Sequence, residues 1–349
     1  MKLLAISDTY IPHDVMRDGL AELTPLGVEI EVRSWEHPTL IELQEANLQI
    51  ETGGPESVPF GEHLTRDVEQ FDILVIQFAP VPRQLILAAE NLKVIGVLRG
   101  GTENIDMPLV TERGIAVLNT PGRNARAVAE CTLGLILSEV RNIARSHAEL
   151  KAGRWTRSFP NSQAIPELCC KTVGLVGFGS VARLLAGYVQ AMGARVIAHD
   201  PFVTDAGPEV ELVELDALME RSDVVSIHAR LTDETHHLVG RRQIALMKPT
   251  AVLVNTARSG LVDEPALVEA LVERRIMGAA LDVFDTEPLP TDHPLLTLDN
   301  VTLAPHIAGS TIDAFRNSPR MMAGHLRRLL GGERPLPIVN GVEPTLAVP

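Results

Sequence analysis

The chain has 349 residues, 45% of them hydrophobic, which is enough for two globular domains that each bury a core. Its formal net charge of -14 and its lack of a Lys/Arg-rich run exclude a nucleic-acid partner, because phosphate binding needs a basic face. No apolar run approaches the roughly 18 to 20 residues of a membrane span, and Cys131, Cys169 and Cys170 suit neither a disulfide framework nor a zinc site, so we expect a soluble, cytoplasmic protein without a bound metal.

The first third of the chain is loosely patterned as an α/β domain. Five short apolar runs predict strands: Lys2–Ile6, Val28–Val32, Asp72–Gln77, Lys93–Val97 and Ile115–Leu118. The polar, Gly/Pro-containing stretch Glu51–Ser57 predicts a surface loop between two of them. The next segment, Ala127–Arg141, has helical periodicity and is apolar on much of its surface, which suits a subunit interface and a domain core equally.

From residue 172 onward, β-branched runs alternate regularly with amphipathic helices such as Val181–Met192 and Pro265–Arg274. Six runs predict strands of a parallel sheet: Thr172–Val176, Arg195–His199, Val224–His228, Ala251–Asn255, Gly278–Asp282 and Val301–Leu303. A final helical stretch, Thr311–Leu330, is expected to pack back on the first domain. We therefore predict an α/β chain of two Rossmann-like or flavodoxin-like domains with a cleft between them, comprising residues 1–119 plus 311–349 and residues 120–310.

A glycine-rich turn between a strand and a helix predicts a dinucleotide site within residues 173–182. Gly177 permits the turn, Gly179 lets the backbone approach a pyrophosphate, and Ala182 allows close packing of the helix on the strand. The amides of Ser180 and Val181 then lie at the helix N-terminus, where the partial positive charge favours phosphate.

An acidic residue follows the next strand. Asp200 lies 23 positions beyond Gly177, where its carboxylate can accept hydrogen bonds from the adenosine ribose and would repel a 2′-phosphate. The sequence therefore predicts NAD, in preference to NADP, as the cofactor.

Three later segments each end a strand and carry polar residues. They are residues 254–260 with Arg258, residues 281–288 with Glu287, and residues 301–309 with His306. Ligands of open α/β sheets gather at the carboxyl ends of strands, so we expect these side chains to lie close together.

These segments, together with Asn119–Gly122, Ala127–Glu130 and the glycine-rich turn, resemble the D-isomer-specific 2-hydroxyacid dehydrogenases, a family that includes glycerate, phosphoglycerate and D-lactate dehydrogenases. The likeness runs from about residue 72 to residue 332. It implies that Arg258 holds the substrate carboxylate and 2-oxygen, that His306 moves the proton at that oxygen, and that Glu287 orients the imidazole and favours its charged form.

The resemblance also implies binding roles outside this triad. Asp282 is expected to position the nicotinamide carboxamide, and Thr256, Ala257 and Gly309 to line the same cofactor. Residues 228–230, His-Ala-Arg, replace the apolar or proline-containing segment that many relatives place against the adenine, which leaves those contacts open.

In the first domain, the loop of Arg99, Gly100 and Gly101 occupies the position of the family's substrate-carboxylate loop, where glycines expose backbone amides to an anion. Arg99 replaces a smaller residue, and we hypothesise that it contacts a distal hydroxyl or phosphate of the substrate. The expected partner is therefore a small anionic 2-hydroxy or 2-oxo acid.

We further expect a homodimer, no regulatory domain of the kind carried by long phosphoglycerate dehydrogenases, and closure of the cleft about hinges near Asn119–Pro121 and Pro305–Ser310. Three other functions stay open. The chain could be an NAD(H)-sensing interaction protein of the co-repressor type, a formate dehydrogenase, or a Rossmann enzyme with an amino or thioether substrate. The formate dehydrogenase is disfavoured because those enzymes pair the catalytic histidine with an amide, whereas Glu287 is an acid.

Overall fold

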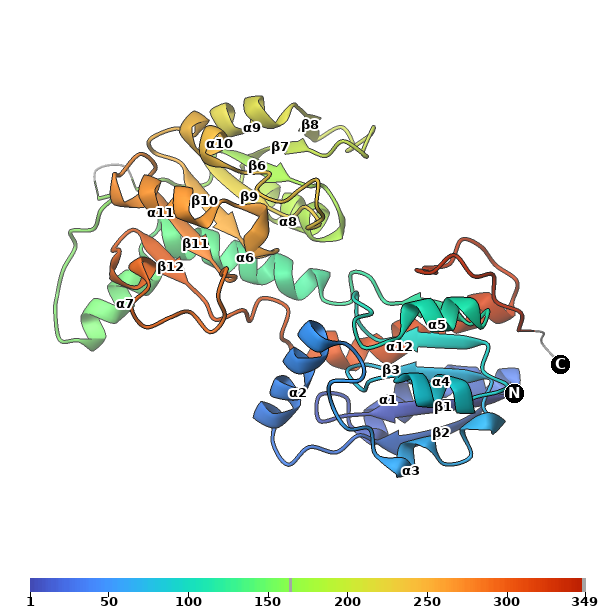
Figure 1. The fold of residues 1–349 in the computed structure, drawn as a ribbon. Coiled ribbons are helices and arrows are strands. Elements are labelled where there is room, and N and C mark those ends of the chain that lie inside the picture. Colours follow the sequence, from blue (N-terminus) through green and yellow to red (C-terminus); the bar gives the residue numbers. More distant parts are fainter. Residues whose placement is uncertain (163–164, 347–349) are drawn as a thin grey trace. The chain divides into compact units, whose positions relative to one another are not determined.

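The computed structural model describes residues 1–162 and 165–346, and Figure 1 shows its ribbon. The chain divides into two compact units, one of Met1–Arg123 with Thr311–Pro349 and the other of Asn124–Ser310. Each unit is built on one parallel sheet with helices packed against it, so the predicted α/β class with two Rossmann-like domains is confirmed. The domain boundaries expected after residues 119 and 310 stay predictions.

The sheet of the first unit has five parallel strands in the order β2-β1-β3-β4-β5. The strands are β1 (Lys2–Ser7), β2 (Glu29–Ser34), β3 (Ile73–Ile76), β4 (Val94–Val97) and β5 (Ala116–Asn119). Every residue of β3, β4 and β5 is buried because both faces of the sheet are covered, which explains their nearly unbroken apolar sequences. The five strands expected in this region are confirmed.

The C-terminal helix of the chain belongs to the first unit. The helical segments there are α1 (His13–Leu20), η1 (Ala21–Leu26), α2 (Leu40–Gly53), α3 (Glu62–Thr65), η2 (Val68–Gln70), α4 (Arg83–Ala88), α5 (Met107–Glu112) and α12 (Ile312–Leu330). Met322 and Leu326 of α12 join the core formed by β1 and β3. A Cβ at Gly96 of β4 would lie 2.7 Å from Met322 Sδ, so this glycine lets α12 approach the sheet.

The prediction of a surface loop at Glu51–Ser57 is wrong for its first three residues, because α2 continues through Gly53. Ile50 is buried and holds the last turn on the core, and its carbonyl accepts a hydrogen bond from the N–H of Gly54. Gly54 has a φ of 80°, which ends the helix in the left-handed region that glycine tolerates. The helix therefore presents Glu51 from a fixed backbone.

The second unit contains a seven-stranded parallel sheet in the order β12-β11-β10-β9-β6-β7-β8. The strands are β6 (Thr172–Val176), β7 (Arg195–His199), β8 (Val210–Leu212), β9 (Val224–Ile227), β10 (Val252–Asn255), β11 (Gly278–Leu281) and β12 (Val301–Leu303). The six predicted strands are present, but the count of six is wrong. The short edge strand β8 pairs only with β7 and has Glu211 exposed at its centre, so it lacks the apolar run that would predict a strand.

The helical segments of the second unit are α6 (Ala125–Val140), α7 (Ile143–Lys151), α8 (Ser180–Ala191), α9 (Leu215–Arg221), α10 (Arg241–Leu246), η3 (Ser259–Leu261), α11 (Glu264–Val272) and η4 (Pro294–Thr297). α6 packs against α8, β10, β11 and β12, and its residues Ala129, Ile136 and Val140 are buried in the core. The apolar surface of this helix thus serves the domain core. In the described ranges, no helix is long and apolar enough to cross a membrane.

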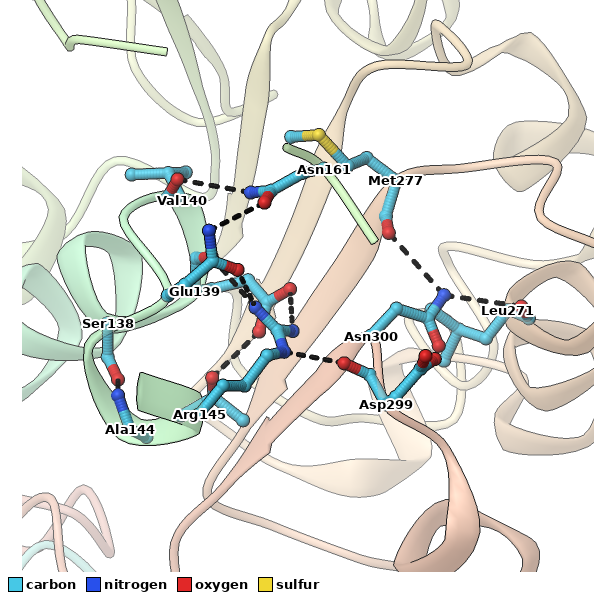
Figure 2. Close-up of polar contacts among 12 residues, drawn as sticks. Ser138, Glu139, Val140, Ala144, Arg145, Asn161, Leu271, Met277, Asp299 and Asn300 are labelled. Carbon is cyan, nitrogen blue, oxygen red and sulfur yellow. Dashed lines mark hydrogen bonds and ion pairs between the residues drawn. The ribbon is translucent and has the colours of Figure 1, made fainter. Parts of the chain in front are cut away.

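Polar contacts fasten the end of α6 to the sheet (Figure 2). Glu139, almost fully buried, accepts hydrogen bonds from the Arg145 guanidinium and from the Thr302 hydroxyl of β12. Burial raises the pKa of Glu139, while Arg145 lowers it. Arg145 also donates to the carbonyl of Asp299, so it connects the first turn of α7 to the loop before β12. The Glu139–Arg145 ion pair therefore fixes the start of α7 relative to the core.

Candidate active site

The carboxyl ends of five neighbouring strands line up at one edge of the second unit's sheet. The hydrogen-bonded register aligns one residue from each strand; in order along the sheet these are Val176, Ile227, Asn255, Leu281 and Leu303. Neighbouring strands lie about 4.8 Å apart. The predicted cofactor and catalytic residues of this unit follow these strand ends, except Asp200, which follows the end of β7 beside β6, so the sheet gathers them along a single edge.

The glycine-rich turn leads from β6 into α8. Gly177 has a φ of 88°, and a Cβ there would lie 2.6 Å from the backbone nitrogen of Ala229, so no other residue fits. A Cβ at Gly179 would meet nothing within 4 Å, which leaves open space beside the first turn of α8. Ala182 is fully buried where the helix crosses the sheet. The backbone amides of Ser180 and Val181 lie in that first turn, where a helix N-terminus favours an anion.

Asp200 connects the glycine-rich turn to the end of β7. Its Oδ2 accepts a hydrogen bond from the N–H of Phe178 at 2.8 Å, and its Oδ1 accepts one from the N–H of Phe202 at 2.9 Å. An ionised carboxylate offers about four lone-pair sites, so two backbone bonds leave capacity for ribose hydroxyls. The carboxylate is thus held beside the turn that is expected to bind the pyrophosphate.

Asn255 shapes the loop that carries Arg258. Its Oδ1 accepts from the N–H of Ala257 at 3.0 Å, and its Nδ2 donates to the carbonyl of Arg258 at 2.9 Å. Thr256 is buried and shares a hydrogen bond of 2.7 Å with the hydroxyl of Thr132 on α6. The Arg258 side chain is exposed, and its Nη1 donates to the carbonyl of Ala257. The backbone is therefore fixed while most of the guanidinium fork faces solvent.

Asp282 holds the loop that contains His306. It is fully buried, and its two carboxylate oxygens accept hydrogen bonds from the N–H groups of Ile307 at 2.8 Å and Ala308 at 2.9 Å. Burial raises the pKa of Asp282, and these two backbone bonds lower it. A role of Asp282 toward the nicotinamide stays a prediction, whereas its contacts already explain how the loop is positioned.

His306 and Glu287 form a hydrogen-bonded pair. His306 Nδ1 lies 2.6 Å from Glu287 Oε2, and Glu287 Oε1 accepts from the N–H of Phe284 at 3.0 Å. His306 has a φ of 53°, a left-handed conformation that its loop imposes, and its side chain is 48% exposed. Because Nδ1 faces the carboxylate, Nε2 is the ring nitrogen that can meet a substrate.

Gly309 follows in the same loop, and a Cβ there would collide with the side-chain amide of Asn124 at the start of α6. This contact accounts for a glycine at the position, and the expected contact with the cofactor stays a prediction.

Thr132 was not expected from the sequence to contribute to the site. The signal that could have indicated it was a hydroxyl on a largely apolar stretch of helix. Thr132 fixes the loop before Arg258 through Thr256.

His228 lies where the sequence left the adenine contacts open. It follows β9, its Nε2 is 2.8 Å from Ser226 Oγ, and burial lowers its pKa to about 4. The imidazole is therefore neutral at physiological pH. The backbone of His228 and Ala229 also packs against Gly177, so this segment supports the glycine-rich turn.

The predicted substrate loop lies in the first unit after β4. Arg99 is buried and donates to Asn47 Oδ1 at 2.8 Å, to Glu51 Oε1 at 2.7 Å and to Glu103 Oε2 at 3.0 Å. The carbonyl of Gly100 accepts from Asn119 Nδ2 at 2.7 Å. A Cβ at Gly101 would collide with the Glu103 carboxylate. These contacts make Arg99 an organiser of its own loop, and its proposed contact with a substrate stays a hypothesis.

The three cysteines carry free thiols, and among the described residues no cluster of three or more His, Cys, Asp or Glu side chains is arranged to hold a metal ion. The site therefore consists of a glycine-rich turn, a hydrogen-bonded histidine–carboxylate pair and an exposed arginine along one sheet edge. These are the parts of an oxidoreductase that uses a dinucleotide.

Comparison with known proteins identifies the family. Residues 133–308 match the model described as D-isomer specific 2-hydroxyacid dehydrogenase, NAD binding domain. The chain is 42% identical over 288 residues to a glyoxylate reductase of Thermofilum pendens, covering 81% of this chain and 85% of the relative. It is 43% identical over 264 residues to a hydroxypyruvate reductase of Thermotoga maritima, covering 73% and 85%. The chain belongs to the D-isomer specific 2-hydroxyacid dehydrogenase family.

The fold leads to the same family. The chain is similar to the structure of a D-2-hydroxyisocaproate dehydrogenase, with a TM-score of 0.76 and 26% identity over 98% of this chain and 100% of that chain. The expected family, the NAD-dependent dehydrogenase class and the NAD cofactor are thereby confirmed.

Proposed function

We propose that the chain interconverts a small D-2-hydroxy acid and its 2-oxo acid, with a glycerate-like, phosphoglycerate-like or sugar-acid-like substrate. The observation that carries this proposal is the His306–Glu287 hydrogen bond at the sheet edge that also bears Arg258. An acid–base group and a carboxylate-binding fork are what the reaction requires of the protein. The similarity to a glyoxylate reductase and a hydroxypyruvate reductase supports a short 2-oxo acid.

The residues of the second unit fit NAD. The open space beside Gly179 admits a pyrophosphate, and Asp200 has acceptor capacity for ribose hydroxyls. Thr256, Ala257, Asp282 and Gly309 would line the nicotinamide end. When bound, NAD(H) supplies or removes the hydride at C2 of the substrate.

The protein contributes orientation and proton transfer. The planar guanidinium of Arg258 holds the substrate carboxylate and 2-oxygen by two parallel hydrogen bonds. Nε2 of His306 donates a proton to the 2-oxygen during reduction and takes it back during oxidation. Glu287 stabilises the imidazolium and, through its bond to the N–H of Phe284, keeps the ring from rotating. In the first unit, the Gly100 and Gly101 backbone would bind the substrate carboxylate.

Asp200→Asn is expected to relax the choice of cofactor. The amide keeps an acceptor for the Phe178 N–H but removes the charge that would repel a 2′-phosphate. The ratio of kcat/KM with NADH to that with NADPH should fall about 10- to 100-fold, the effect of relieving one like-charge contact. Asp205→Asn, in the same exposed loop, is the control and should leave the ratio unchanged. Strict retention of NADH preference in Asp200→Asn would contradict the assignment.

We also propose a homodimer that forms through α7 and the segment after it. Every side chain of α7 is at least partly exposed, and a nine-residue helix has little stability without packing. Ile143 and Leu150 are each 55% exposed and Trp155 is 84% exposed, which makes an apolar surface.

The free thiols further support a reducing, cytoplasmic location.

Light scattering should accordingly give twice the chain mass of 37.9 kDa. The double variant Leu150→Asp/Trp155→Asp is expected to shift the protein to the monomer mass, because two charges would be buried at the interface. Ile41→Asp, at a 65% exposed position of α2 in the first unit, should remain dimeric. A wild-type monomer at micromolar concentration, or dissociation of the Ile41→Asp control, would refute this surface.

The test of the proposed activity is oxidation of NADH, followed by its absorbance, with a panel of 2-oxo acids that includes glyoxylate, hydroxypyruvate, 3-phosphohydroxypyruvate, pyruvate and a four-carbon hydroxylated acid. Turnover of at least one acid supports the proposal and ranks the substrates. Tight NADH binding with no turnover on the whole panel would instead support the co-repressor-type sensing role.

A further inference from the structure

The segment that carries Glu287 is exposed, so hydrogen bonds have to hold it in place. Phe284 is buried, but the residues after it, 285–288, are all exposed. Two successive backbone N–H groups of this segment each donate to a carboxylate. The N–H of Phe284 donates to Glu287 itself, and the N–H of Asp285 donates to Glu264 on α11. Glu264 therefore connects the backbone that leads to Glu287 with a helix of the same unit.

Glu264 presents its carboxylate from a rigid element. It is the first residue of α11, directly after Asp263, whose side chain caps the helix by accepting from the N–H of Ala266 at 3.0 Å. Ala266 and Leu267 are buried, which packs this first turn on the core. The Glu264 side chain is only 13% exposed, and its Oε2 accepts from the N–H of Asp285 at 3.2 Å. A carboxylate in the first turn is also stabilised by the helix dipole.

His293 fixes the other oxygen of Glu264. Its Nε2 lies 3.2 Å from Glu264 Oε1, and its Nδ1 accepts from the N–H of Leu295 at 3.3 Å. A ring nitrogen that accepts carries no proton, so the neutral imidazole donates from Nε2 to the carboxylate. Leu295 is fully buried and ties the ring to the core. Both oxygens of Glu264 and both nitrogens of His293 are thus engaged, which keeps the two side chains from rotating.

These contacts end on the histidine–carboxylate pair of the candidate site. Glu264 holds the backbone two residues before Glu287, whose Oε2 lies 2.6 Å from His306 Nδ1. On the other side of the pair, Asp282 holds the two N–H groups that follow His306. Each member of the pair therefore has its own carboxylate anchor. Such anchoring matters because a misplacement of about 1 Å can slow a reaction about 100-fold.

We propose that Glu264, oriented by His293, is a positioning residue for the reaction and acts by keeping Glu287 against His306 Nδ1. This inference rests on the proposed function, since it concerns the pair to which that function assigns proton transfer. Loss of the Glu264 carboxylate releases the exposed segment after Phe284. Glu287 then meets the imidazole in only part of the molecules, and His306 transfers its proton more slowly.

The first test is the variant Glu264→Ala, with kcat counted per NADH-binding site so that unfolded protein does not contribute. We expect kcat for the best 2-oxo acid to fall about 10- to 100-fold and KM to change less than about threefold. The ratio of kcat in ordinary water to kcat in heavy water should rise, because proton transfer then limits the rate. Glu264→Gln should return kcat to within about fivefold of wild type, since its amide oxygen can still accept from the Asp285 N–H.

A double-mutant cycle tests whether Glu264 acts through Glu287. In a Glu287→Ala background, Glu264→Ala should lower kcat further by less than about twofold, because the group that it positions is already gone. Losses that multiply would overturn the inference. His293→Ala should lower kcat about threefold, a smaller effect in the same direction, because Glu264 keeps its bond to the backbone but becomes free to rotate.

Glu269→Ala is the matched control. Glu269 belongs to the same helix and pairs at the surface with Arg241 and Arg275, away from the segment that carries Glu287. Its removal should leave kcat and the solvent isotope ratio unchanged. A purely structural role of Glu264 would appear in Glu264→Ala as a lower melting temperature with unchanged kcat per site and an unchanged isotope ratio, and that result would overturn the inference.

A readout without turnover separates this inference from the proposed function. In protein labelled at its histidines, the NMR signals of the His306 ring, identified by their loss in His306→Ala, should move in Glu264→Ala and stay in place in Glu269→Ala. Signals that stay in place in both variants would overturn the inference. Ring signals that respond to Glu264→Ala in an enzyme that turns over none of the acids would support the inference and count against the proposed function alone.

Discussion

His306→Ala is expected to lower kcat for reduction of the best 2-oxo acid by about 10²- to 10⁴-fold, the usual contribution of a positioned general acid. Without the imidazole, the oxygen that becomes negative as hydride reaches C2 has no proton donor at Nε2. NADH affinity should stay within about threefold of wild type, because His306 lies outside the glycine-rich turn and the Asp200 loop that are assigned to the pyrophosphate and the ribose. Loss of NADH oxidation, with an unchanged NADH dissociation constant in a fluorescence titration, would show that His306 acts in catalysis and not in cofactor binding.

The control for the histidine variant is His13→Ala, an exposed residue at the start of α1 in the first unit. It should keep wild-type kcat. Partial recovery of His306→Ala activity by added imidazole would identify proton transfer as the lost function. An Ala variant that retains more than about a tenth of wild-type kcat at saturating substrate would exclude His306 as the general acid.

Arg258→Lys is expected to lower kcat/KM for the 2-oxo acid by about 10²- to 10³-fold, although the charge is kept. Lysine is a point charge and cannot make the two parallel hydrogen bonds by which a guanidinium orients a carboxylate. Losing the geometry of two charge-assisted hydrogen bonds, each worth about 1.5 to 3 kcal/mol, is consistent with this range. The Arg258 side chain is exposed and makes its hydrogen bond to the Ala257 carbonyl, so the melting temperature should not change.

A neutral analogue of the substrate sharpens the arginine test. Wild type should favour the 2-oxo acid over the corresponding 2-oxo amide, and Arg258→Lys should lose most of that preference. Arg241→Lys, at an exposed ion pair with Glu269 in the same unit, should retain wild-type kinetics. Equal losses on acid and amide would assign Arg258 to the fold of its loop and not to carboxylate binding.

Sequence patterns predicted most of the strands because buried parallel strands need nearly continuous apolar residues. All residues of β9 and β10 are buried, for example, and both strands were expected. The same reasoning failed for β8, where an exposed Glu211 at the sheet edge hides the strand. It also failed at the end of α2, where the buried Ile50 extends a helix into a polar stretch. Edges and helix ends depend on neighbours that local sequence does not contain.

Site residues divide in a similar way. The positions of Gly177, Asp200, Arg258, Glu287 and His306 after strand ends could be predicted from the sequence, and the parallel sheet gathers whatever follows those ends. The supporting contacts were not found. Nothing in the spacing indicated that Asp282 would accept hydrogen bonds from the two backbone N–H groups that follow His306.

What the sequence determined by itself was the family, the NAD cofactor and the identity of the polar residues at each strand end, since these depend on short motifs in a fixed order. Only the tertiary structure decided which polar groups satisfy one another and which do not. Arg99, expected to reach a substrate, donates to Asn47, Glu51 and Glu103, whereas Asp8 and Gln77 are buried with side-chain atoms that have no hydrogen-bond partner among the described residues. The reason is physical: burial and hydrogen-bond pairing are properties of residues far apart in the chain, and they exist only once the sheets have formed.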